Sequence, residues 1–290
     1  MAWRYGSAPL TAGLIALVVL GAAVVLGPAL RPHPDAVNID HGLSASGSPL
    51  PPSWSAPLGT DELGRDVAAR VSAGLGTSLI TALLATALAL TIGVTFGLLG
   101  GLARRGTRWL DSLLGRAVDV ALALPSLLLV ILAAAAVRAA AADGAPPTPT
   151  TSVVTTALVL GLLGWPVVAR VVHARAAVLA RSEMVLAARA LGAGTAGVLW
   201  RHILPNLRGV VLALATIVMA LILLADATLS FVGLGAPPPM ATLGRMVFEG
   251  RVYFRTAPWL LFAPGLAIVL AVGTFQVLSA SLRQRLEGGE

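Results

Sequence analysis

The sequence predicts an all-α membrane protein with six transmembrane helices, because of its composition and the apolar runs along it. Of its 290 residues, 57% are hydrophobic and only 11% are charged, whereas soluble domains carry about 25% charged residues. A chain with so few polar side chains cannot cover itself with a hydrated surface. Six segments are each mostly apolar and close to the roughly 20 residues that a helix needs to cross a bilayer.

The six predicted spans are residues 10–30, 79–100, 117–137, 152–169, 209–225 and 257–282. Only the third contains a charged residue, Asp119 near its start. We expect Asp119 to pair with Arg116, which lies three residues earlier and therefore on the same helix face. The first span is too long for the apolar core of a signal peptide, and no clean cleavage site follows it, so we interpret it as an uncleaved anchor.

Six spans place both termini on the same side of the membrane. If that side is the cytoplasm, the inner segments hold 13 of the 20 arginines and the outer segments hold 7. Basic residues concentrate in the cytoplasmic loops of membrane proteins, so we expect a multi-pass protein of the cytoplasmic membrane with both termini inside. This topology explains the net charge of +7, and no nucleic-acid partner is expected.

Two residue types are absent, and each absence excludes a kind of site. The chain has no cysteine, which excludes disulfides, thiolate metal ligands and cysteine nucleophiles. All 20 basic residues are arginine, so no GxxxxGK[ST] loop is present to cradle the phosphates of ATP. The four histidines show no metal-ligand spacing and no acid–histidine–hydroxyl set. We therefore expect no metal, no cofactor and no catalytic activity in this chain.

The inner segment 170–208 is long, basic and helical in pattern. Ser182 can cap a helix that begins at Glu183, and apolar or small residues then recur at helical spacing. Gly192 and Gly194 break this helix, a second short helical stretch follows, and Pro205 either closes it or starts the next element. The small residues would let another protein approach closely. By pattern alone, an amphipathic loop resting on the membrane surface fits equally well.

The order of residues in this segment resembles the cytoplasmic signature loop of binding-protein-dependent permeases of ATP-binding-cassette importers. The pattern of that family is EAA, three residues, Gly, nine residues, I-x-L-P. The residues at the matching spacing are Ala187, Ala188, Gly192, Leu204 and Pro205. Leu186 replaces the glutamate of the pattern and His202 replaces its isoleucine. In this family the loop forms a coupling helix that docks in a cleft of the ATPase subunit, which the resemblance implies for residues 183–206, from Glu183 onward.

Three further stretches resemble motifs of the dipeptide/oligopeptide/nickel branch of this family, in the same order along the chain. Residues 58–66 (LGTDELGRD) look like LGTDxxGRD, residues 226–235 (DATLSFVGLG) look like EAxLSFLGLG, and residues 263–265 (APG) look like FPG. The resemblance covers residues 58 to 285. The chain departs from the branch near its end, where Gln276 replaces an asparagine, and this weakens any transfer of fine substrate specificity.

The resemblance implies the fold of type I importer permeases. Residues 1–78 would form an anchor helix and an extracytoplasmic segment, residues 79–285 a core of five transmembrane helices with the coupling loop 170–208, and residues 286–290 a cytoplasmic tail. The implied partners are a second, homologous permease in a heterodimer, two cytoplasmic ATPase subunits that carry ATP and Mg²⁺, an extracytoplasmic solute-binding protein, and membrane lipid. The two permeases would form a path for di- or oligopeptides. Close relatives carry nickel, glutathione or other small solutes.

A polar cluster follows the first predicted span and has two interpretations. Thr60, Asp61, Arg65 and Asp66 could form an outer gate or a contact for the solute-binding protein. Alternatively, they form a self-satisfied polar turn, in which the acids cap a helix starting near residue 63 and pair with Arg65 or Arg70.

A charged residue at membrane depth is costly and is a functional candidate by default. Asp226 follows a long apolar run, so it could line the translocation path. Alternatively, it is a structural acid bonded to Thr228 or Ser230.

A different class of function is an ion-coupled secondary transporter or channel. Such a protein would need several charged residues in the middle of its spans. The spans are nearly free of charge, which favours the importer.

Overall fold

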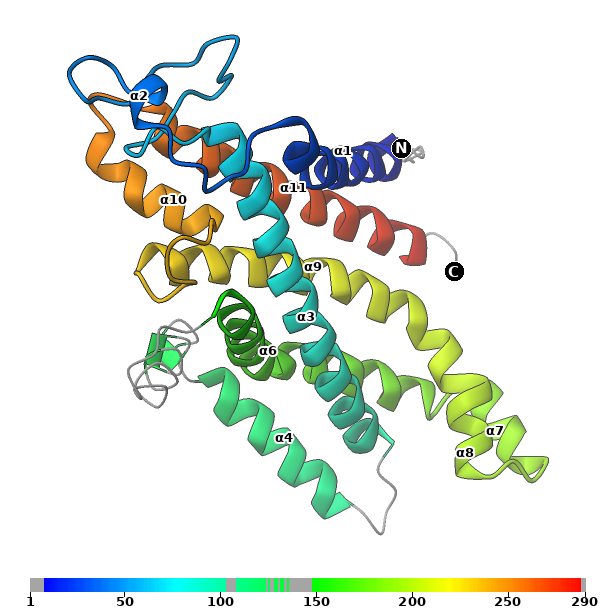
Figure 1. The fold of residues 1–290 in the computed structure, drawn as a ribbon. Helices are drawn as coiled ribbons and strands as arrows, with labels where there is room; N and C mark the ends of the chain where they lie inside the picture. The colour runs from blue at the N-terminus through cyan, green and yellow to red at the C-terminus, as the bar shows by residue number, and fades with distance from the viewer. Residues whose placement is uncertain are drawn as a thin grey trace.

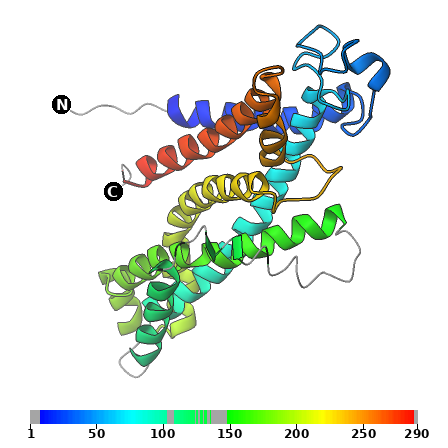
Figure 2. The same ribbon diagram turned by 90° about the vertical axis from the view of Figure 1, so that its left-hand side faces the viewer.

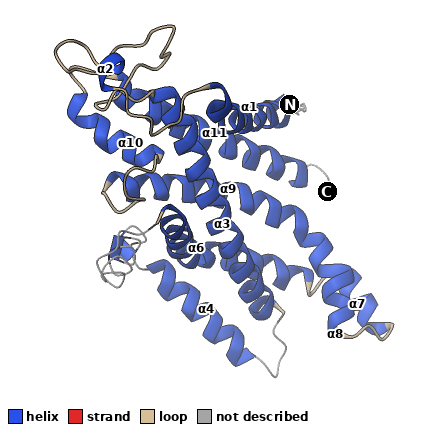
Figure 3. Cartoon of the chain, viewed as in Figure 1, coloured by secondary structure: helices blue, strands red, loops and turns tan. Residues whose placement is uncertain are grey.

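The computed structural model describes residues 8–102, 108–123, 125, 128–129, 131–132, 135 and 148–287. Within these residues the chain consists of helices joined by turns and loops, with two isolated antiparallel bridges and no strand (Figure 3). The helices are α1 (Ala8–Leu30), α2 (Ile39–Gly42), α3 (Val67–Gly101), α4 (Arg108–Ala123), α6 (Pro149–Leu179), α7 (Glu183–Ala190), α8 (Thr195–Val198), a π-helical turn (Leu199–Ile203), α9 (Leu204–Phe231), α10 (Leu243–Gly250), a 3-10 turn (Arg251–Tyr253) and α11 (Trp259–Glu287).

Five helical stretches within the described residues are long and apolar enough to cross a membrane. They are Pro9–Leu30, Val67–Gly101, Thr150–Leu179, Thr195–Phe231 and Trp259–Gln284. These correspond to the first, second, fourth, fifth and sixth predicted spans. The third predicted span, residues 117–137, overlaps the end of α4, and most of its remainder lies outside the described residues. The prediction of an all-α membrane fold is confirmed.

The bundle is arranged around α3, which crosses its centre (Figure 1). One side of α3 packs against α6 along much of its length, and α9 lies beside both helices. Helix α11 packs on α9, and α1 lies outermost against α11 and α3. Helices α7 and α8 lie on the same side of the bundle as the first residues of α1 and the last residues of α11, whereas α2 and α10 lie on the opposite side (Figure 2).

Small residues bring α3 and α6 into close contact. Ala82, Ala85 and Ala89 of α3 are fully buried. A Cβ atom added at Gly97 would lie 2.7 Å from the Cβ atom of Val172 on α6. Apolar side chains gain little by leaving lipid for protein, so close backbone packing and van der Waals contact are the main attraction between membrane helices.

Two helices extend beyond the predicted apolar spans. Helix α3 begins at Val67 and continues without a break past residue 78. The sequence predicts that the extracytoplasmic segment ends at residue 78 and that the transmembrane core begins at residue 79. Helix α6 continues to Leu179, and two polar pairs join this extension to α4. Arg170 pairs with Asp119, and His173 Nε2 lies 2.7 Å from Asp111 Oδ1. The predicted pairing of Asp119 with Arg116 is therefore wrong, because the longer α6 brings a second arginine to the same carboxylate.

Candidate functional site

The α6–α9 loop, defined here as residues 180–203, projects from one end of the bundle (Figure 1). Helix α7 begins at Glu183 as predicted, but the Ser182 hydroxyl donates to the carbonyl of Leu179 at 2.8 Å and makes no capping bond to α7. Val185, Val198 and Ile203 are at most 1% exposed and belong to the same apolar core as the membrane helices. The loop is therefore packed onto the bundle.

The end of α7 explains why glycine stands at position 192. The N–H of Gly192 donates to the carbonyl of Arg189, and the N–H of Ala193 donates to the carbonyl of Ala188, both at 3.0 Å. This pair of bonds is the Schellman arrangement, which needs a left-handed residue after the helix. Gly192 has φ of +88°, a conformation that side chains disfavour. These two hydrogen bonds and the left-handed conformation of Gly192 thus fix the direction in which the chain leaves α7.

The α6–α9 loop carries several large apolar side chains that the described residues leave partly or largely exposed. Met184, Leu186, Leu191 and Trp200 are 41, 55, 89 and 69% exposed. Glu183 and Ala187 are exposed as well, and Ala188 is half-buried. Exposed apolar surface of this kind typically marks an interaction site with protein or membrane.

A widened turn connects the loop to α9. The N–H of Leu204 donates to the carbonyl of Leu199, five residues earlier, which makes residues 199–203 π-helical. Pro205 follows in the first turn of α9, directly after the π-helical turn, and it lacks the backbone N–H that could bond back into that turn. Pro205 thus starts the next element, one of the two predicted alternatives. The π-helical turn was not predicted from the sequence, and such turns occur frequently at functional sites.

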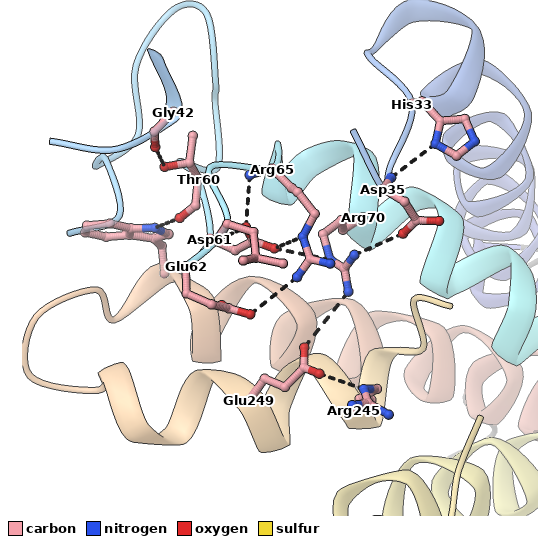
Figure 4. Close-up of polar contacts among 12 residues, drawn as sticks. His33, Asp35, Gly42, Thr60, Asp61, Glu62, Arg65, Arg70, Arg245 and Glu249 are labelled. Carbon is pink, nitrogen blue, oxygen red and sulfur yellow. Dashed lines mark hydrogen bonds and ion pairs between the residues drawn. The ribbon is translucent and has the colours of Figure 1, made fainter. Parts of the chain in front are cut away.

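A buried ion-pair network lies at the opposite side of the bundle, centred on Asp61 (Figure 4). Asp61 Oδ2 lies 2.6 Å from Arg65 Nε and 3.5 Å from Arg70 Nε. Its other oxygen, Oδ1, accepts bonds from the backbone N–H groups of Leu63 and Arg65 at 3.0 and 2.9 Å. Asp61, Arg65 and Arg70 are 4, 7 and 2% exposed. One carboxylate therefore neutralises two buried guanidinium groups in part.

The network also joins three segments that are distant in sequence. Arg70 NH1 lies 3.1 Å from Asp35, and Arg70 NH2 lies 3.9 Å from Glu249 on α10. Glu249 is held in turn by Arg245 at 2.6 Å. Asp35 and Glu249 were not predicted as members. The only sequence signal was the spacing of Arg245 and Glu249, which are four residues apart on one helix face.

Thr60 and Asp66 complete the turn that leads into α3. The Thr60 hydroxyl donates to the carbonyl of Gly42 at 2.6 Å, and Trp259 Nε1 donates to the carbonyl of Thr60 at 3.1 Å. Asp66 Oδ1 accepts the backbone N–H of Ala68 at 2.8 Å and so caps α3, which begins at Val67 and not near residue 63. Asp61 has the contacts expected of a self-satisfied polar turn, whereas Asp66 Oδ2 lies 3.5 Å from Arg31, which was not a predicted partner, and has no hydrogen-bond partner among the described residues. Any contact with a partner would have to pass through more exposed neighbours of Thr60, Asp61 and Arg65.

The surroundings of Glu62 in this network affect the titration of its carboxyl. Burial raises the pKa of the Glu62 carboxyl above its ordinary value, and the negative charges of Asp61 and Glu249 act in the same direction. A backbone hydrogen bond and Arg65, whose NH2 lies 3.3 Å from Glu62 Oε1, act against this rise. Although several carboxylates gather here, no three metal-ligating side chains among the described residues could hold a metal ion.

Asp226 lies in α9 and is 4% exposed. Its carboxyl lies near the hydroxyl of Ser78 on α3, but the Ser78 hydroxyl makes no hydrogen bond of normal geometry among the described residues. The predicted bond to Thr228 or Ser230 is wrong. The Thr228 hydroxyl donates to the carbonyl of Leu224, and the Ser230 hydroxyl has no partner within the described part of the chain. Asp226 therefore faces the α3–α9 interface.

Comparison with known proteins identifies the family. Residues 93–288 match the family described as binding-protein-dependent transport system inner membrane component. A protein of Brucella suis biovar 1, whose name describes a peptide permease, is 35% identical over 278 residues, which cover 95% of this chain and 85% of the relative. The dipeptide transport system permease protein DppC of Alkalihalophilus pseudofirmus is 32% identical over 79% of this chain and 71% of its own length. The chain thus belongs to the family of binding-protein-dependent transport system inner membrane components.

Proposed function

We propose that this chain is a permease subunit of an ATP-driven importer, and that the α6–α9 loop is its contact with the ATPase. The observation that carries the proposal is the loop itself. Val185, Val198 and Ile203 anchor it in the core, while Leu191 and Trp200 extend apolar surface away from the bundle. Gly192 fixes the direction in which the chain leaves α7, so these exposed side chains are held in one arrangement that a partner could recognise.

The proposed mechanism is alternating access. ATP and Mg²⁺ would bind to the ATPase subunits, which this chain does not contain. Closure of the ATPase dimer would move the α6–α9 loop, and hydrolysis would reset it. Because the loop passes directly into α9 through Leu204, with no flexible linker, its displacement would be transmitted to α9 and to Asp226 at the α3–α9 interface. The energy enters as the different affinity of ATP for the two conformations.

The proposed solutes are di- or oligopeptides, because the similar proteins from Brucella and Alkalihalophilus carry peptide or dipeptide transport in their names. A second, homologous permease would complete the path, in a heterodimer. The nearly charge-free spans suit a path that tolerates many side chains. Selection would then rest largely with an extracytoplasmic binding protein.

We place the binding-protein contact on the segment between α1 and α3. The network of Asp61, Arg65 and Arg70 would act here as a rigid support, and the exposed side chains of the same segment would make the contact. Trp54 is fully exposed, and Ile39 is 60% exposed. Thr60 and Asp66 would shape the outer mouth by holding the chain against Trp259 and at the start of α3.

Co-purification tests the central proposal. The chain would be purified in mild detergent from its native membrane, and the proteins that accompany it would be identified by mass spectrometry. We expect ATPase subunits and a second permease. Leu191→Ser should remove the ATPase while the second permease remains. Val252→Ser is the matched control, since Val252 is also exposed, at 76%, but lies beyond α10 on the other side of the bundle.

Two results would count against the proposal. If the unmodified chain repeatedly came out without an ATPase, under conditions that preserve other importers, an independent carrier would become the better assignment. If Leu191→Ser and Val252→Ser retained the ATPase equally, the chain would still be an importer subunit, but its ATPase contact would lie elsewhere.

A further inference from the structure

A groove of about 510 Å³ lies between α6, α9 and α11, near the end of the bundle that carries α7 and α8. Helices α6 and α11 flank α9 on opposite sides (Figures 1 and 2), so α9 forms the floor. The apolar lining includes Val171 and Val178 of α6, together with Leu207, Val210 and Leu214 of α9.

The polar lining of this groove consists of two arginines and an amide. Arg175 of α6, Asn206 of α9 and Arg283 of α11 all face it, and all three are exposed. Neither arginine has an acidic partner among the side chains that the structure describes. Arg170, five residues before Arg175 on the same helix, does pair with an acid, Asp119. Among the described side chains, the positive charge of this groove therefore has no acidic partner.

The apolar lining extends from these charges toward the middle of the membrane. Val171 lies one turn before Arg175 on α6, and Val210 and Leu214 lie one and two turns after Asn206 on α9. Both helices enter the bilayer core in these directions, because Thr150–Leu179 and Thr195–Phe231 are membrane-capable stretches. An anionic group joined to a hydrocarbon chain would match both the charged and the apolar parts of this lining.

We propose that this groove binds an anionic phospholipid, with its phosphate between Arg175 and Arg283 and one acyl chain along α9. Charge complementarity selects an anionic head group, since basic residues at a membrane surface attract anionic lipid. The apolar walls select a lipid over a free phosphate or a peptide carboxylate. With the orientation proposed above, the lipid belongs to the cytoplasmic leaflet. It would hold α6, α9 and α11 together next to the α6–α9 loop.

Native mass spectrometry of the purified full chain tests this proposal. The chain would be released from micelles containing phosphatidylglycerol or phosphatidylcholine with identical acyl chains, and the lipids retained would be counted. We expect one phosphatidylglycerol to be retained preferentially. Each of Arg175→Gln and Arg283→Gln should weaken its binding about fivefold, and the double variant more. Arg116→Gln is the matched control, because Arg116 is an exposed arginine of α4 that lies outside the groove.

A second variant and a competitor separate the lipid from other occupants. Val178→Trp adds bulk at a groove position that is 69% exposed, so folding should survive, and it should displace the lipid while both arginines remain. Glycerol phosphate, the head group without acyl chains, should not compete. Equal retention of phosphatidylcholine, equal loss in Arg116→Gln, unchanged binding in the double variant, or displacement by glycerol phosphate would each overturn the proposal. No ATPase or transport is involved, so failure of the importer assignment would leave this result standing.

Discussion

The carboxylate of Asp61 links the two buried arginines of the ion-pair network. It contacts both Arg65 and Arg70, which are buried beside each other. Removing one partner of a buried pair costs up to about 3–5 kcal/mol, and here Glu62, Asp35 and Glu249, which are less buried than Asp61, would be the acids left beside the two arginines. We therefore expect Asp61→Asn to lower the unfolding temperature of the purified protein strongly.

An exposed ion pair supplies the control for this measurement. Asp119 and Arg170 are paired, but their side chains are 66 and 54% exposed, and exposed pairs contribute at most about 1 kcal/mol. Asp119→Asn should therefore have a small effect. If Asp61→Asn were equally mild, the network would not be what holds the segment between α1 and α3.

Glu62 should make the stability of this region depend on pH. Because burial raises the pKa of the folded carboxyl, the folded state keeps its proton at pH values where the unfolded chain has already lost it. Stability should therefore fall as pH rises from the ordinary glutamate pKa, about 4.3, through the raised folded value. Thermal unfolding across this window should show the fall in the unmodified protein and a smaller one in Glu62→Gln. Identical pH profiles would show that Glu62 does not titrate in this way.

At the scale of elements, Gly192 ends α7 by its backbone conformation and not by a lack of space. No atom lies within 4 Å of a Cβ built there, yet φ is +88°. Gly192→Ala should therefore cost about 1–2 kcal/mol locally and reduce ATP-driven uptake. Gly197 in α8 also has open space, but its φ is not positive, so Gly197→Ala should leave uptake intact. Similar losses in both variants would show that small size, and not backbone conformation, matters in this loop.

The contact between α3 and α6 gives the opposite case, in which space is limiting. A Cβ at Gly97 would lie 2.7 Å from Val172 and 2.8 Å from the carbonyl of Ala169. Gly97→Ala should destabilise the bundle by about 1–3 kcal/mol through overpacking, although alanine is the better helix former. Gly273→Ala in α11 meets no atom within 4 Å and should be neutral or stabilising. The unfolding temperatures of the Gly97→Ala and Gly273→Ala variants, each compared with that of the unmodified protein, test this difference.

The apolar runs were sufficient to predict where the membrane helices lie, but not where they end. Helix α3 begins before its apolar run because Arg70 is buried against Asp35, Asp61 and Glu249, partners that hydropathy cannot reveal. Helix α6 outlasts its run because Arg170 and His173 pair with α4. In the α6–α9 loop, local signals predicted the start of α7 and its break at Gly192, since both depend on neighbouring residues. The exposure of Trp200 depends on how the loop packs and could not be predicted.

At the scale of the whole molecule, the α6–α9 loop and the ion-pair network around Asp61 lie at opposite sides of the bundle (Figure 2). The orientation of the chain in the membrane therefore determines which of them faces the cytoplasm. With the six predicted spans, the side of the α6–α9 loop holds 13 arginines against 7 on the other side, and the positive-inside tendency therefore favours our proposal that this loop is cytoplasmic. The chain has no cysteine, so single cysteines can report this orientation without background. Trp54 and Leu191 suit the purpose, because both are largely exposed.

We expect Trp54→Cys to react with a membrane-impermeant maleimide in intact spheroplasts, and Leu191→Cys to react only after the membrane is opened. The chain would be expressed without partner subunits, so that Leu191 is not covered. Reaction of both cysteines in the opened sample controls for folding and expression. The reverse labelling pattern would show that the protein has the opposite orientation in the membrane, so that Leu191 could not contact a cytoplasmic ATPase. It would also place the groove of Arg175 and Arg283 in the outer leaflet, although its affinity for an anionic lipid would not change.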